Sequence, residues 1–101
     1  MTTNAYKYLQ NLLGERISLG MAIRAIRNND NISQGVFAKK LNITQSYLSD
    51  IEHNRKQISP KKAAEFATLL GHSVKQFVRL SIQDALQKSG LLYEVDIKDV
   101  A

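Results

Sequence analysis

Hydrophobic residues recur along most of the chain at spacings of three and four, with polar residues between them. That spacing places the hydrophobic side chains on one face of a helix and is typical of amphipathic helices. Near residues 91–100 the spacing changes to two, which is typical of a strand with one covered face. The pattern predicts a short strand there and helices over 4–17, 33–41, 44–54, 61–70 and 73–90. A further helix is predicted to begin at residue 19 and to end within 28–31.

Residues that favour helix starts support these boundaries. Ser33 and Thr44 each precede an apolar run, and a hydroxyl at that position can accept a hydrogen bond from an unpaired backbone N–H. Ser59 is followed by a proline, which helices favour at their first position. Ser73 has Gln76 three residues later, which is the spacing of a capping box.

The composition agrees with a single packed domain. The chain has 101 residues, of which 44% are hydrophobic and 23% are charged, with one proline and five glycines. These values are close to the globular average, and no internal repeat or linker interrupts the chain. We therefore predict one domain over 1–101 with an all-α fold: a bundle of about five helices with an added N-terminal helix and a short C-terminal β-strand.

Several classes of protein are disfavoured. The absence of cysteine excludes disulfide scaffolds, thiolate metal sites and cysteine nucleophiles, and it fits a reducing compartment. No apolar run suits a signal peptide or a membrane span, so we expect a cytoplasmic protein. The sequence has no glycine-rich phosphate loop and no catalytic motif, and its two histidines lack further ligands. We therefore expect no enzymatic activity, no metal and no cofactor.

The net charge of +5 favours an anionic partner, either nucleic acid or an acidic membrane surface. Residues 1–62 carry ten basic and four acidic side chains, whereas residues 63–101 carry four basic and five acidic ones. A surface that faces an anion therefore lies in the first two-thirds of the chain. Binding to a membrane surface requires a basic amphipathic helix, and none of the predicted helices has more than scattered basic charge.

The most informative feature is the pair of short predicted helices 33–41 and 44–54. Two helices joined by a turn of three or four residues form a helix-turn-helix, whose second helix lies in the DNA major groove. A side-chain amide such as that of Gln45 can form two hydrogen bonds with one adenine, accepting from N6 and donating to N7. The helix starts, at Gln34 and Gln45, direct backbone N–H groups outward and can anchor phosphates.

Four basic residues follow the second helix of this pair: Arg55, Lys56, Lys61 and Lys62. Taken alone, such a group is usually a solvated charged face. Directly after a helix that enters the major groove, contact with the flanking phosphates is the better interpretation.

Three consecutive segments agree in order, spacing and residue type with one known family. They are IRAIR at 23–27, ISQGVFAKKLNI at 32–43 and TQSYLSDIE at 44–52. Over residues 19–77 the chain resembles the Cro/C1-type helix-turn-helix family, also called the Xre family, of phage and bacterial repressors. The resemblance implies a lambda-repressor-like bundle that binds a palindromic operator in double-stranded DNA as a homodimer and represses transcription.

The resemblance also implies roles for individual residues. Arg27 and Glu52 are expected to form a structural salt bridge, Gln34 to grip a phosphate, and Gln45 and Ser46 to meet base edges. Tyr47 fits either a partly buried core position or a phosphate contact. The full predicted DNA-binding set is Ser33, Gln34, Thr44, Gln45, Ser46, Tyr47, Ser49, Asp50, Asn54, Arg55, Lys56 and Lys61.

The chain departs from the family pattern at three turns and on the DNA-facing side. Asn31, Asn42 and Asn54 stand where the family usually has glycine. Asparagine tolerates the left-handed region better than other non-glycine residues, so we expect these turns to survive. Asp50 is an acidic residue on the DNA-facing side, which repels phosphate and gains only by accepting a hydrogen bond from cytosine N4.

Residues 78–101 lie beyond the family core and are predicted to form a dimerisation or partner-binding extension. Its strand, Leu91 to Val100, is expected to pair with the same strand of a second subunit. Residues 91–101 carry three acidic side chains against one lysine, a charge that could complement a small basic toxin protein. HigA-type antitoxins resemble this chain in size and domain class, so an antitoxin that represses its own operon is the alternative hypothesis.

Overall fold

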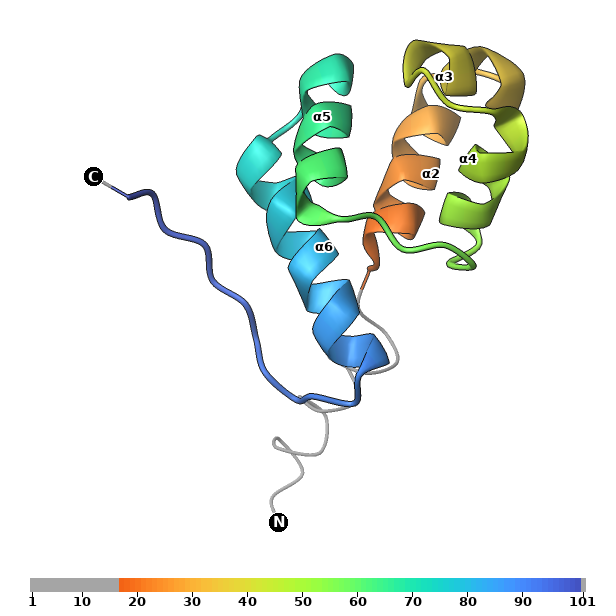
Figure 1. The fold of residues 1–101 in the computed structure, drawn as a ribbon. Helices are drawn as coiled ribbons and strands as arrows, with labels where there is room; N and C mark the ends of the chain where they lie inside the picture. Colours follow the sequence, from red (N-terminus) through yellow and green to blue (C-terminus); the bar gives the residue numbers. More distant parts are fainter. Residues whose placement is uncertain (1–16, 101) are drawn as a thin grey trace.

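A computed structural model describes residues 17–100, and this part of the chain folds as a bundle of helices (Figure 1). The predicted all-α architecture is thereby confirmed, while the predicted leading helix 4–17 lies outside the described residues except for Ile17. None of the helices in this part is long and apolar enough to cross a membrane. The helices are α2 (Leu19–Asn29), α3 (Gln34–Lys40), α4 (Gln45–Glu52), α5 (Pro60–Leu70) and α6 (Val74–Lys88).

Each of these helices begins in the same way. A serine or threonine precedes the first helical residue, and its hydroxyl oxygen accepts a hydrogen bond from the backbone N–H three residues later. This bond satisfies one of the donors that a helix start leaves unpaired. The capping roles predicted for Ser33, Thr44 and Ser59 are confirmed, and Ser73 accepts from the backbone N–H of Gln76 at 3.1 Å.

Each helix also ends in the same way, with a residue in the left-handed region. The residues are Asn31, Asn42 and Asn54, with φ of 54°, 59° and 60°, and Gly71 and Gly90. Around each one, two backbone N–H groups fold back onto carbonyls of the last helical turn, which is the Schellman arrangement. The prediction that asparagine can hold the three turns is confirmed.

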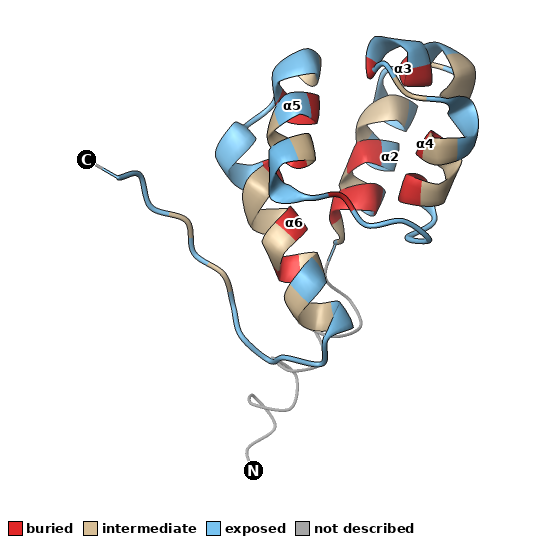
Figure 2. Ribbon diagram, in the orientation of Figure 1, coloured by how far each residue is buried: buried red, intermediate tan, exposed pale blue. Residues whose placement is uncertain are grey.

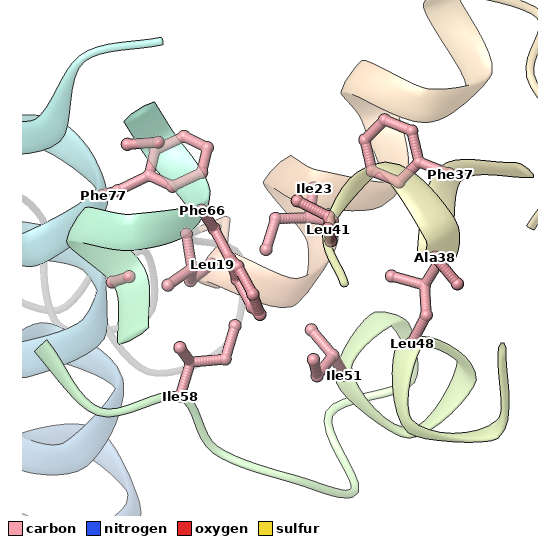
Figure 3. Close-up of a cluster of buried hydrophobic side chains, with 12 residues drawn as sticks. Leu19, Ile23, Phe37, Ala38, Leu41, Leu48, Ile51, Ile58, Phe66 and Phe77 are labelled. Carbon is pink, nitrogen blue, oxygen red and sulfur yellow. The ribbon is translucent and has the colours of Figure 1, made fainter. Parts of the chain in front are cut away.

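The helices pack in two pairs that α2 joins. α5 lies against α6, α3 lies against α4, and α2 contacts both α4 and α6 (Figure 1). The buried residues lie on the inward faces of the helices (Figure 2). They form one cluster, which is shown in Figure 3: Leu19, Ile23, Phe37, Ala38, Leu41, Leu48, Ile51, Ile58, Ala63, Phe66, Ala67 and Phe77. Val36 is 60% exposed, because Phe37, Ala38 and Leu41 occupy the inward side.

Polar contacts fix α2 relative to its neighbours at its first turn. The backbone N–H of Leu19 donates to the carboxylate of Asp84 on α6 at 3.0 Å. Gly20 faces α4 so closely that a Cβ atom at this position would collide with the carbonyl oxygen of Ile51. Glycine is therefore required here by close approach to α4, and this approach sets how α4 is presented to the outside.

The predicted C-terminal β-strand is wrong. Residues 91–100 are extended but contain no strand within the described part of the chain, and they return beside α6 (Figure 1). The side chain of Gln83 takes the place of a neighbouring strand: its Nε2 donates to the Tyr93 carbonyl at 2.7 Å, and its Oε1 accepts from the Val95 N–H at 2.8 Å. Val95 and Ile97 are half-buried, while the charged residues Glu94, Asp96 and Lys98 that alternate with them are exposed. The alternation thus reflects an extended segment lying along a helix.

Candidate nucleic-acid interface

Helices α3 and α4 are joined by a tight turn that brings their starts together. The Ile43 N–H donates to the Ala38 carbonyl at 3.0 Å, which closes the turn. A Cβ atom on Gly35 would lie 3.4 Å from the side-chain oxygen of Gln45. The side chain that begins α4 therefore lies over the first turn of α3.

The outward face of α4 carries a stripe of small and polar side chains. Gln45 and Ser46 are exposed, and Ser49 and Asp50 follow one helical turn later and are half-exposed. The opposite face buries Leu48 and Ile51 in the core, so the stripe cannot turn inward. Together with two flanking residues the stripe lines a shallow hollow of about 430 Å³; the lining residues are Gln34, Gln45, Ser46, Ser49, Asp50 and Arg55.

A buried ion pair holds α4 beneath this surface. Arg27 Nε donates to Glu52 Oε2 at 2.8 Å, and Arg27 Nη2 donates to Glu52 Oε1 at 2.9 Å. A third donor, Nη1, reaches the carbonyl of Ile32 at 3.0 Å, and Gln34 Nε2 donates to Glu52 Oε1 at 3.1 Å. One carboxylate therefore joins α2, α3 and α4, and Arg27 and Glu52 form the pair that the family resemblance implies.

The environment of Glu52 favours its ionised form. Burial alone would raise the pKa of its carboxyl group, because a charge is costly away from water. Hydrogen bonds from Arg27 and Gln34 and the positive charges of Arg27 and Arg24 outweigh that effect, so the pKa of Glu52 is lowered from its ordinary value of 4.5. The pair is therefore ionised at neutral pH.

A second arginine–carboxylate pair lies on the exposed stripe itself. Arg55 Nε donates to Asp50 Oδ1 at 2.8 Å, and Arg55 Nη2 donates to Ser49 Oγ at 3.2 Å. The left-handed Asn54 turns the chain back over the end of α4, so that the Arg55 N–H also donates to the Asp50 carbonyl at 2.8 Å. The sequence predicts Asp50 and Arg55 as separate DNA contacts, whereas in the structure they contact each other.

A family model described as helix-turn-helix matches residues 23–76, more than half of the chain. The chain belongs to the Cro/C1-type helix-turn-helix family. No curated protein and no solved structure matches the chain significantly. The family is a family of DNA-binding domains and not of enzymes, so this helix-turn-helix protein is a DNA-binding regulator, with α3 and α4 as its helix-turn-helix.

The remaining predicted contacts of this helix-turn-helix do not lie in the hollow. The hydroxyls of Ser33 and Thr44 accept hydrogen bonds as helix caps. Tyr47 is half-buried and packs against the core cluster, which favours the first of its two interpretations. Asn54 Oδ1 accepts from Ser18 Oγ at 2.8 Å.

The basic residues after the helix-turn-helix are spread around it. Lys56 lines a different hollow of about 400 Å³, which lies between the start of α2 and the last part of α6. Lys61 is exposed near the start of α5. Lys62 Nζ lies 3.6 Å from the carboxylate of Glu65 and 5.7 Å from the centre of the Phe66 ring. Within residues 17–100 there is no group of three or more His, Asp or Glu side chains that could hold a metal ion.

Proposed function

We propose that this protein is a cytoplasmic, sequence-specific transcriptional repressor that binds a palindromic operator as a homodimer. The observation that carries the proposal is the outward stripe of α4, in which Gln45, Ser46 and Ser49 lie on one exposed face of a helix whose other face is locked into the core. Amide and hydroxyl groups match the donors and acceptors of base edges in the major groove. In this proposal α4 enters the groove and α3 crosses the sugar–phosphate backbone.

The flanking groups suit phosphate contacts. Gln34 at the start of α3 uses one amide N–H on Glu52, which leaves the other for an acceptor outside. Exposed Lys56 and Lys61 follow α4 in the chain. Lysine ammonium groups near the groove neutralise phosphates and release counterions, which makes binding depend on salt. We propose these three residues as phosphate contacts.

A dimer follows from the short reach of α4, which can contact only a few base pairs. Two copies on successive major grooves roughly double the specific binding energy. We propose residues 78–101 as the assembly surface of the core 19–77. This extension exposes Leu91, Leu92 and Tyr93, whose exposed fractions are 46%, 48% and 67%.

Selection of bound sites from a random pool of double-stranded DNA tests this function. The expected result is a palindromic sequence whose half-sites are one helical turn apart. Binding to the selected site should weaken by about 0.9 log units per phosphate contact for each log unit of salt. A pool that yields no enriched sequence, or a flat salt profile, would contradict the proposal.

Two substitutions separate base contacts from phosphate contacts. Gln45→Ala should cost about 1–3 kcal/mol of binding free energy at particular base positions, whereas Lys61→Ala should weaken all sequences alike. Binding of each variant to a library of single-base changes in the selected site measures both effects. If the two variants weaken every sequence equally, the assignment of the α4 stripe is wrong.

The second candidate is an antitoxin that binds a small basic toxin protein and represses its own operon. The observation that favours it is the extended tail 91–100, which is held through its backbone by Gln83 while most of its side chains remain exposed. The tail is also acidic, with Glu94, Asp96 and Asp99. Co-purification with the product of a neighbouring small basic reading frame tests this function. If deletion of 91–101 changes neither toxin binding nor dimerisation, the tail is not the partner-binding segment.

A further inference from the structure

Arg55 brings a positive charge to a helix that has none of its own. α4 contains no lysine or arginine between Gln45 and Glu52. Among the residues that line the hollow on its outward face, Arg55 is the only cation. Arg55 follows the end of α4 in the chain, yet its guanidinium folds back to Ser49 and Asp50, in the second turn of the helix. It therefore lies beside the side chains that face the groove.

The hydrogen bonds of Arg55 leave one edge of its guanidinium free of partners in the helix. Nε–H is directed to Asp50, and one N–H of Nη2 is directed to Ser49. A guanidinium has five N–H donors, so both donors of Nη1 and the second donor of Nη2 remain. Two parallel donors from Nη1 and Nη2 match the O6 and N7 acceptors of guanine in the major groove.

The charge of the pair favours a base over a phosphate as the acceptor. Asp50 Oδ1 lies 2.8 Å from Arg55 Nε, so the two side chains together carry almost no net charge. Attraction to a phosphate depends on net positive charge, which the carboxylate cancels. Guanine is neutral and is recognised by the position of two donors, which the carboxylate and Ser49 hold in place.

We propose that Arg55 recognises a guanine in each half-site, and that Asp50 acts as its positioning residue and not as a base contact. Ser49 supports the same orientation through its hydroxyl. This inference rests on the proposed function, because it requires α4 to lie in the major groove. It assigns a specificity-determining role to a residue outside the helix, and it gives the acidic group on the DNA-facing side a purpose that does not involve phosphate.

The experiment uses the full chain and the operator selected from the random pool. At one position of each half-site, guanine should bind about 5- to 150-fold better than the other bases, which is the range of a good bidentate contact. Arg55→Ala should abolish this preference at that position and leave the preferences that depend on Gln45 intact. Arg55→Lys should retain the charge but lose most of the preference, because an ammonium cannot present two parallel donors.

Asp50→Asn tests the positioning role. It should reduce the guanine preference because a neutral amide oxygen holds the Arg55 guanidinium less firmly than a carboxylate does, while total binding at low salt should rise or stay constant because a negative charge has been removed. The dependence of binding on salt should become steeper for the same reason. Lys56→Ala is the matched control: it should weaken all sequences alike and should make the salt dependence shallower.

Replacement of the guanine by 7-deazaguanine separates this inference from a direct contact between Asp50 and cytosine. The analogue lacks the N7 acceptor but leaves the paired cytosine unchanged, so it should weaken binding of the unmodified protein and have no effect on Arg55→Ala. If 7-deazaguanine has no effect on the unmodified protein, or if Arg55→Ala weakens all sequences evenly, the inference is wrong. If Gln45→Ala still changes the base preference at a particular position of the site, the proposed function stands. If the pool yields no enriched sequence, both fail.

Discussion

Within residues 17–100 the protein contains two arginine–carboxylate pairs in opposite environments. In each pair an arginine Nε lies 2.8 Å from a carboxylate oxygen. The side chains of Arg27 and Glu52 are 16% and 0% exposed, whereas those of Arg55 and Asp50 are 55% and 28% exposed. The first pair lies beneath α4 and the second lies on its outer face.

This difference shows how burial decides what an ion pair does. The Glu52 carboxylate is removed from water, and hydrogen bonds from Arg27 and Gln34 together with the positive charges of Arg27 and Arg24 compensate for this loss. Removing either Arg27 or Glu52 leaves the other charge largely buried without its ion-pair partner, and that is costly. Asp50 and Arg55 remain in contact with water, so their mutual attraction contributes little to stability. The exposed pair instead fixes the orientation of the Arg55 guanidinium.

The largest expected effect that separates the two pairs is on folding stability. Glu52→Ala should lower the free energy of unfolding by about 3–5 kcal/mol, because Arg27 then remains largely buried without its partner. Asp50→Ala should lower it by about 1 kcal/mol or less, as is usual for exposed pairs. Chemical denaturation of both variants, followed by circular dichroism, measures the difference. Equal losses would mean that burial does not distinguish the pairs.

Local chemistry explains why so much of the fold could be predicted from the sequence. Helix starts at Ser33, Thr44 and Ser59 depend on contacts within three residues, and the ends at Asn31 and Asn42 depend on one backbone angle. Such signals can be recognised without knowing the tertiary structure. The pairing of Arg27 with Glu52 came from the family resemblance and not from the residues alone.

The features that could not be predicted depend on tertiary contacts with residues that are not adjacent in the sequence. The alternation in 91–100 indicates one covered face, but it does not reveal that Gln83 and α6 cover it in place of another strand. Gly20 lies inside α2, where the carbonyl of Ile51 leaves no space for a side chain, and the local sequence does not reveal this neighbour. From the sequence, Asp50 is unfavourable for DNA binding because it repels phosphate. Its ion-pair partner, Arg55, comes close to it only because the chain turns back at Asn54.

The next largest effect is on the response to acid. A carboxyl group whose folded pKa is lowered contributes stability that is fully present above its unfolded pKa, near 4.5 for Glu52, and is lost as the pH falls through the folded pKa. Below pH 4.5 the difference in stability between the unmodified protein and Glu52→Gln should therefore shrink, by at most about 1.4 kcal/mol per pH unit. Denaturation curves from pH 7 to pH 3 test this. A difference that stays constant over that range would show that Glu52 titrates alike in the folded and unfolded states.

The smallest effect is the sharpest test of the exposed pair, because it concerns coupling and not total stability. A double-mutant cycle with Asp50→Ala, Arg55→Ala and the double variant should give a coupling energy of about 0.2–1 kcal/mol at low salt. In 1 M salt, where the screening length is about 3 Å, that coupling should weaken. The same cycle on Glu52 and Arg27 should keep most of its coupling, because ions do not enter the space between two buried groups. If the coupling between Asp50 and Arg55 is larger than about 2 kcal/mol and resists salt, the exposed pair stabilises the fold. The helix α4 would then depend on this pair for its structure, and a reduced guanine preference in Asp50→Asn would no longer indicate the orientation of Arg55 alone.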